Sequence, residues 1–80
     1  MMANTAEDKY ALIRRMVNGK YGIRFYEIAT ALVEAGYYTG KDLDEKEKVN
    51  DDINAVIAQG YIRWSNGFGG FVPVAGKELR

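Results

Sequence analysis

The chain has 80 residues, of which 48% are hydrophobic and 28% charged, and its acidic and basic residues balance to zero net charge. This length and composition predict one small globular domain, residues 1–80, rather than a disordered chain. Cysteine and histidine are both absent, which excludes disulfides, the usual zinc sites and the Ser-His and Cys-His catalytic pairs. The single serine, Ser65, lies in a predicted turn. We therefore expect a protein that is not an enzyme and that holds no cofactor or metal.

The expected location of the protein is the cytoplasm. No apolar run approaches the roughly 20 residues that a membrane-spanning helix needs. The first ten residues, MMANTAEDKY, have neither the basic nor the apolar region of a secretory signal. The absence of cysteine fits a reducing compartment. Zero net charge means that no overall field attracts nucleic acid.

The first predicted element is a helix over residues 5–18. Its apolar residues recur at helical spacing and form one stripe, which consists of Ala6, Tyr10, Ile13 and Val17. Thr5 is the expected N-cap, and Asn18-Gly19 ends the helix. A short extended segment, residues 21–24, follows.

The second predicted helix covers residues 25–35 and ends at Gly36. Its apolar stripe consists of Phe25, Ile28, Leu32 and Ala35. The segment GYYTG then forms a loop, on which Tyr37 and Tyr38 are expected to be exposed. The third helix starts between Asp42 and Glu45 and ends at Gln59, with Gly60 after it. Its core residues are Val49, Ile53, Val56 and Ile57.

After Gly60 the periodicity changes from helical to alternating. Residues 61–64 and 71–74 are predicted to form two strands, and Asn66-Gly67 between them is a hairpin signal. Pro73 lacks the backbone donor of a sheet ladder, so its strand should lie at an edge. The last six residues, AGKELR, are too few for more than one helical turn. The predicted fold class is therefore α+β, with a three-helix bundle followed by a C-terminal β-hairpin.

From Phe25 onward, three segments resemble the winged helix-turn-helix superfamily of DNA-binding domains. FYEIATALVEAG is similar to the positioning helix of that superfamily, and VNDDINAVIAQGYIRW is similar to its third helix running into the first wing strand. FVPVAGKEL is similar to the second wing strand and the end of many transcriptional regulators. The resemblance implies a third helix that enters the major groove of double-stranded DNA and a hairpin wing that contacts phosphate or the minor groove.

The resemblance implies a transcriptional regulator whose DNA-binding residues are Lys46, Lys48, Asn50, Asn54, Arg63 and Arg24. Asn54 can pair with adenine, and Lys48 with guanine or phosphate. Arg14, Arg15 and Lys20 add positive charge near the first two helices. A homodimer would double the number of phosphate contacts.

The segment KDLDEKEKVNDD, residues 41–52, is unusually acidic for a helix that meets phosphates. Asp44 as N-cap with Glu47 three residues later has the spacing of a capping box, which accounts for the acids at the helix start. The capping box does not account for Asp51 and Asp52, which lie further into the helix. Asp42-x-Asp44 opens like a calcium loop, but the required glycine and glutamate are missing. The linker before the third helix also exceeds the usual 3–4 residues, so either the helix begins early or the turn is a longer loop.

The acidic helix suggests a second hypothesis, in which the chain is a protein-interaction module, inhibitor or adaptor that binds a basic protein partner. The residues expected to contact that partner are Glu47, Asp51, Tyr37, Tyr38 and Phe68. Phe68 lies in the glycine-rich tip of the hairpin, where it either folds back on the strands or makes a contact. Winged helices perform both kinds of function, and the fold alone does not distinguish them.

Overall fold

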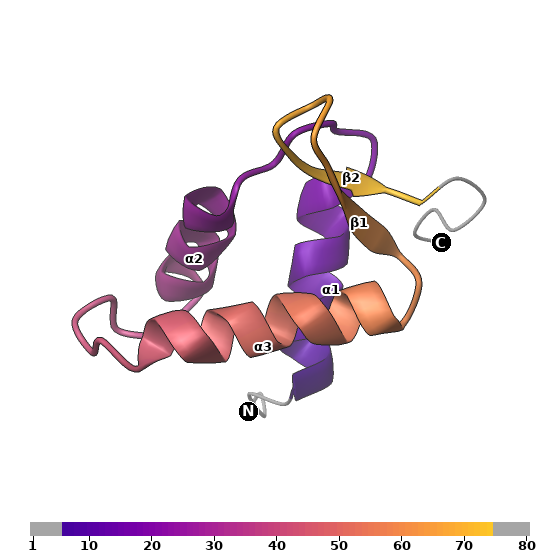
Figure 1. Ribbon diagram of the computed structural model, residues 1–80. Coiled ribbons are helices and arrows are strands. Elements are labelled where there is room, and N and C mark those ends of the chain that lie inside the picture. The colour runs from indigo at the N-terminus through magenta and orange to yellow at the C-terminus, as the bar shows by residue number, and fades with distance from the viewer. Residues whose placement is uncertain (1–5, 75–80) are drawn as a thin grey trace.

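The computed structural model describes residues 6–74, which form three helices followed by an antiparallel hairpin (Figure 1). The elements are α1 (Ala6–Val17), α2 (Phe25–Glu34), α3 (Glu45–Ala58), β1 (Ile62–Ser65) and β2 (Gly70–Pro73). This is the α+β layout of a winged helix, which confirms the predicted fold class. The predicted cap Thr5 and the final segment AGKELR lie outside the described residues.

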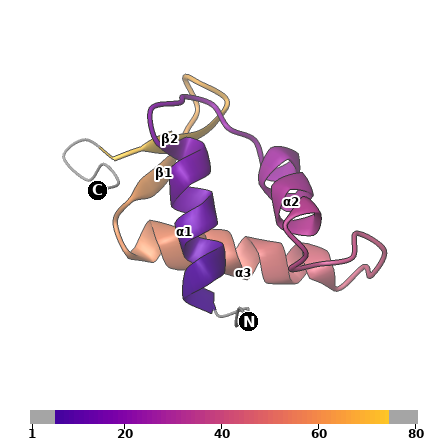
Figure 2. The same cartoon turned by 180° about the vertical axis from the view of Figure 1, so that it is seen from behind.

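Helix α1 packs across α3 and is seen in front of it from behind the molecule (Figure 2). Ile13 and Val17 are fully buried, and Tyr10 packs against the core as predicted. Ala6, by contrast, is exposed, so its assignment to the buried stripe is wrong. The first turn of α1 projects past α3 (Figure 1), which leaves Ala6 nothing to pack against.

Helix α2 ends at Glu34, one residue before the predicted end, and Ala35 is its C-cap residue. Gly36 follows with a φ of 90° that other residues adopt only with strain, so it stops the helix as predicted. The backbone N–H of Tyr37 donates to the carbonyl of Leu32, and that of Gly36 to Val33, which is the usual arrangement at a helix end capped by glycine. Ala35 is already outside the helix and exposed, so its assignment to the buried stripe is also wrong.

The connection between α2 and α3 is a ten-residue loop, residues 35–44. Of the two alternatives for the helix-turn-helix linker, an early start of the third helix or a longer loop, the longer loop is therefore correct. The predicted capping box at Asp44 is wrong. Asp44 is itself in helical conformation, with φ of −67° and ψ of −18°, and its side chain makes no capping hydrogen bond. Instead, the carboxylate of Asp42 accepts a 3.0 Å hydrogen bond from the backbone N–H of Asp44.

The two strands pair antiparallel, with Ile62 opposite Pro73 and Ser65 opposite Gly70. The predicted extended segment before α2 is confirmed, because Ile23 forms an isolated bridge with Phe71. Gly70 allows this close approach. A Cβ atom there would lie 2.4 Å from the backbone of Gly22. Strand β2 therefore lies between β1 and the α1–α2 connection.

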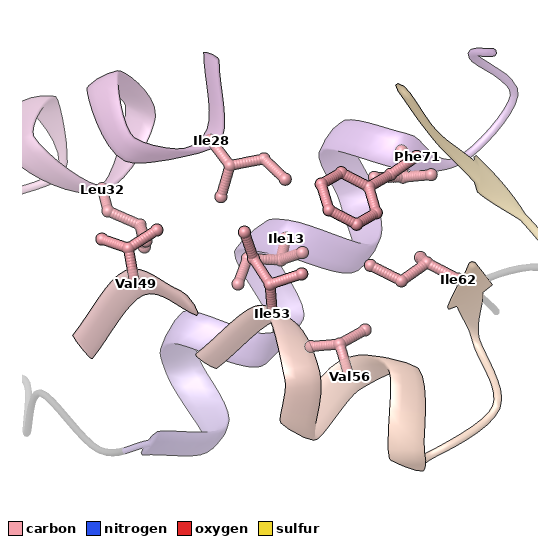
Figure 3. Close-up of a cluster of buried hydrophobic side chains, with 9 residues drawn as sticks. Ile13, Ile28, Leu32, Val49, Ile53, Val56, Ile62 and Phe71 are labelled. Carbon is pink, nitrogen blue, oxygen red and sulfur yellow. The ribbon is translucent and has the colours of Figure 1, made fainter. Parts of the chain in front are cut away.

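One hydrophobic core joins all of these elements. Figure 3 shows buried side chains from the helices and the hairpin pointing toward one another. The buried cluster consists of Ile13, Val17, Ile28, Leu32, Val49, Ile53, Val56, Ile62 and Phe71. This core fixes α2, α3 and the hairpin relative to α1, and so positions the outward face of α3.

Candidate nucleic-acid interface

The outward face of α3 carries both polar and acidic side chains. Lys46, Asn50 and Asn54 are exposed and recur every four residues, so they form one stripe along the helix. Glu47 and Asp51 are also exposed and form the neighbouring stripe, nearer the centre of the face. Lys48 is exposed as well but projects from the other side of α3, as its position two residues from Asn50 requires.

A shallow hollow lies between α3 and the first turn of α2. Its lining residues are Phe25, Lys46, Glu47, Asn50 and Asp51. Arg24, which directly precedes α2, is exposed, and its backbone N–H donates a 3.2 Å hydrogen bond to Glu27. The first turn of a helix presents unpaired backbone N–H groups and a partial positive charge, which favours anions. One cationic side chain, Lys46, and the first residue of α2, Phe25, thus line this hollow, and Arg24 directly precedes Phe25 in the chain.

The structure does not bring all predicted DNA contacts into this hollow. Arg63 is exposed on β1, and its cross-strand neighbour Val72 is buried. Lys48 and Asn54 are exposed on α3 outside the lining of the hollow. Only Lys46, Asn50 and the adjacent Arg24 are grouped at one place.

Charge is strongly segregated along the chain even though the total is zero. Residues 9–26 contain five basic residues and no acidic one, whereas residues 27–60 contain eight acidic residues and three lysines. Among the basic residues of the first segment, Arg15, Lys20 and Arg24 are exposed. The basic surface therefore lies mainly on α1 and the α1–α2 connection. Counting charge by segment, rather than over the whole chain, reveals this signal in the sequence.

Arg14 belongs to the same basic segment but is held inside the protein. Its guanidinium donates a 2.7 Å hydrogen bond to Glu7 and a 3.0 Å hydrogen bond to Gln59. It also lies over the ring of Tyr61, 4.9 Å from the ring centre. These contacts join α1 to the end of α3, pair the charge of Arg14 with that of Glu7 and leave only 12% of the Arg14 side chain exposed.

Asp52 does not contribute to the acidic surface, because it is only 6% exposed. Its carboxylate accepts a 2.6 Å hydrogen bond from the hydroxyl of Tyr38 and lies 3.4 Å from the ammonium of Lys9. Lys9 also donates a 3.0 Å hydrogen bond to the Tyr38 hydroxyl. The three side chains form a closed polar cluster between α1, the α2–α3 loop and α3. We call it the Lys9–Tyr38–Asp52 cluster.

This cluster raises the pKa of Lys9 and of Tyr38. Burial opposes the charge of Lys9, but the hydrogen bond to Tyr38 and the attraction of Asp52 outweigh it and raise the pKa of Lys9. Burial and the hydrogen bond to Asp52 raise the pKa of Tyr38. The prediction that Tyr37 and Tyr38 are exposed is therefore wrong, since both are half-buried and pack against the core.

Glu45, rather than Asp44 or Glu47, is the acidic residue that makes hydrogen bonds at the start of α3, and its partners lie in the preceding loop. Its carboxylate accepts hydrogen bonds from the backbone N–H of Thr39 at 2.9 Å, from the hydroxyl of Thr39 at 3.1 Å and from the backbone N–H of Gly40 at 2.8 Å. The hydrogen bonds from Thr39 and Gly40 lower the pKa of Glu45. Glu45 thus closes the α2–α3 loop against the start of α3.

The tip of the hairpin presents an aromatic ring to solvent. Phe68 is 57% exposed, and its ring centre lies 5.1 Å from that of Tyr21, which is 61% exposed. Phe68 therefore leans on the α1–α2 connection without being buried. Trp64 on β1 is half exposed and packs edge-on against Phe71.

Comparison of the chain with known protein families, with curated proteins and with solved structures finds no match. Within residues 6–74, no helix has both the length and the apolar character needed to cross a membrane.

Proposed function

We propose that the chain binds double-stranded DNA through the hollow between α2 and α3, and that it acts as a small regulator of transcription. The observation that carries the proposal is the grouping of Lys46 and Asn50 with Phe25 at the N-terminus of α2, which the exposed Arg24 directly precedes. Lysine, arginine and helix-terminal N–H groups are the donors that hold DNA phosphates, and asparagine can read adenine. No catalytic role is part of the proposal.

Glu47 and Asp51 line the same hollow and oppose this binding. Negatively charged side chains beside DNA phosphates weaken binding. We therefore expect strongly salt-dependent binding with a Kd of about 1–100 μM for duplexes without a preferred site. A homodimer would double the contacts and would account for tighter binding to a palindromic site.

The test is a fluorescence anisotropy titration of a mixed-sequence duplex. With about three phosphate contacts, affinity should fall roughly 40-fold between about 50 and 200 mM salt. Lys46→Glu should weaken binding further, because it reverses the charge at the hollow. Asp51→Lys should strengthen binding for the converse reason.

Lys41→Glu is the matched control, because Lys41 is exposed on the α2–α3 loop and does not line the hollow. It changes the net charge as Lys46→Glu does. Equal effects of the two substitutions would exclude the hollow as the binding site. No binding of duplex at low salt would overturn the proposal itself.

A second candidate function is recognition of a basic protein surface by α3. It is favoured by Glu47 and Asp51, which are exposed near the centre of the outward face and whose side chains make no hydrogen bond or ion pair with any residue in the described range 6–74. Leu43, just before α3, is 86% exposed and could add apolar contact. Tyr38 cannot serve this role freely, since its hydroxyl is held by Asp52.

The two functions are distinguished by the double substitution Glu47→Lys with Asp51→Lys. Under DNA binding, this variant gains affinity for duplex. Under protein recognition, the unsubstituted chain binds a lysine-rich peptide in a calorimetric titration, and the double variant loses that binding. A chain that binds duplex but not the peptide excludes the second function.

A further inference from the structure

The wing of this protein has one exposed cation, Arg63 on β1, but its tip and return strand have none to contact phosphate or the minor groove. Residues 64–74 contain no charged residue at all. In place of a cation, the tip carries Phe68, whose ring contacts that of Tyr21 while both rings remain more than half exposed. Large apolar side chains left in water at one place mark a surface that meets a partner.

The backbone segments that carry the two rings are held close together. The backbone N–H of Phe68 donates to the hydroxyl of Ser65 at 3.3 Å, and that of Gly69 donates to the carbonyl of Ser65 at 2.9 Å. Gly22, next to Tyr21, approaches the tip so closely that a Cβ atom there would lie 2.7 Å from the carbonyl oxygen of Phe68. The tip and the α1–α2 connection are thus packed backbone to backbone, and a planar ligand would meet a preformed aromatic surface.

Positive charge flanks this aromatic pair. Tyr21 lies between Lys20 and Arg24 in the chain, both cations are exposed, and the whole of residues 9–26 is free of acidic side chains. Aromatic rings beside lysine or arginine suit single-stranded nucleic acid, because the rings stack on bases while the cations neutralise the adjoining phosphates. In an intact duplex the faces of the bases are covered by their neighbours, so the rings would gain nothing there.

We infer that Tyr21 and Phe68 form a stacking site for an unpaired nucleobase, and that the chain selects DNA in which an unpaired base adjoins a duplex. The inference rests on the proposed function, since the α2–α3 hollow holds the duplex part. Arg24 lies between the two sites in the chain, directly before α2 and three residues after Tyr21. We expect one DNA molecule to contact both surfaces.

The test compares a blunt duplex with the same duplex bearing a single-stranded adenine overhang, titrated by anisotropy at constant salt. The unsubstituted chain should prefer the overhang, and Phe68→Ala or Tyr21→Ala should weaken overhang binding by about fivefold to a hundredfold. Phe68→Tyr keeps a ring and should retain the preference. In nuclear magnetic resonance spectra, the Phe68 ring protons should shift when the overhang DNA is added, because a stacked adenine lies over them.

Leu43→Ala is the control, since Leu43 is equally apolar and even more exposed but belongs to the α2–α3 loop. Thermal unfolding checks that the Phe68 variants fold, as expected for a mostly exposed side chain. If duplex binds but the overhang adds nothing and Phe68→Ala has no effect, the inference is overturned and the proposed function stands. If only the overhang DNA binds, and Phe68→Ala abolishes this, the inference stands and duplex binding is overturned. Failure of both DNAs to bind overturns both.

Discussion

The hydroxyl of Tyr38 donates a 2.6 Å hydrogen bond to the carboxylate of Asp52, and so connects the α2–α3 loop to the middle of α3. Asp52 lies on the side of α3 that faces Lys9 of α1, and its charge is neutralised there by the 3.4 Å ion pair. One of the six acids in the segment that argued against DNA binding is therefore an internal structural residue. The acidic surface of α3 itself is reduced to Glu47 and Asp51.

Removal of the Tyr38 hydroxyl should destabilise the fold. In Tyr38→Phe, the buried Asp52 loses one of its two partners, so the free energy of unfolding should fall by about 1–2 kcal/mol. Urea denaturation followed by circular dichroism measures the loss. Tyr37→Phe is the matched control, because no hydrogen bond of the Tyr37 hydroxyl is present within the described part of the chain. Equal losses in the two variants would contradict the assigned hydrogen bond.

The Lys9–Tyr38–Asp52 cluster should make stability sensitive to alkaline pH. The pKa values of Lys9 and Tyr38 are both raised in the folded protein, so folding holds their protons more tightly than the unfolded chain does. Their contribution is complete below about pH 10, where both groups are protonated even when unfolded, and it is lost as pH rises through the folded-state pKa values. Melting temperatures measured from neutral to strongly alkaline pH should show the decline.

The control for this decline in melting temperature at alkaline pH is the double variant Lys9→Gln with Tyr38→Phe. It lacks both titrating groups, so its melting temperature should change less over the same alkaline range. A decline as steep as that of the unsubstituted chain would show that other groups are responsible.

Glu45 should control the order of the α2–α3 loop. In Glu45→Ala, the amides of Thr39 and Gly40 lose their acceptor, and their hydrogen exchange should become faster. Glu47→Ala, at the position predicted from sequence to cap the helix, should leave both amides unchanged. Protection of the Thr39 and Gly40 amides that survives in Glu45→Ala would refute the role of Glu45.

The same contact predicts a dependence on acidic pH. The pKa of Glu45 is lowered by the hydrogen bonds from Thr39 and Gly40. Its stabilising effect is therefore present above the unfolded pKa of about 4.3 and is lost as pH falls through the lower folded-state value. Exchange of the two amides, corrected for the intrinsic pH dependence, should accelerate in that range, and the acceleration should be absent in Glu45→Gln.

Gly70→Ala should disrupt the packing of the wing on the α1–α2 connection. The added Cβ would lie 2.4–2.6 Å from backbone atoms of Gly22 and Ile23, which cannot move aside as a flexible side chain can. We expect a loss of about 1–3 kcal/mol or more in the free energy of unfolding. Gly67→Ala is the control, since its nearest neighbour is the Ser65 hydroxyl at 3.8 Å. Thermal denaturation of both variants tests this, and a stable Gly70→Ala would contradict the close approach.

The sequence predicted the elements of this fold because their signals are local. Apolar residues at helical spacing identified the buried faces of α2 and α3, and Gly36 marked the end of α2 through its backbone conformation. These features depend on residues within one or two turns of each other. The errors at Ala6 and Ala35 arose at the ends of helices. There the apolar periodicity continues in the sequence, but the side chains no longer pack against the core.

The surface was less predictable because it depends on contacts between distant residues. Asp52 and Lys9 are far apart in sequence, and only the path of the loop brings Tyr38 between them. Likewise, Glu45 replaced Asp44 as the residue that orders the helix start because the loop folds back toward it. The contact between Tyr21 and Phe68 depends on the Ile23–Phe71 bridge, which no local pattern signals.

The bridge at Phe71 also determines how the protein can respond to a ligand. The Phe71 carbonyl accepts hydrogen bonds from Gly22 and Ile23, its N–H donates to Ile23, and its ring lies in the core (Figure 3). A slip of β2 by one residue would turn this ring outward and break all three bonds. Because these bonds connect β2 to the segment just before α2, we expect the wing and that segment to move together, so that the spacing between contacts that they make on a ligand changes little.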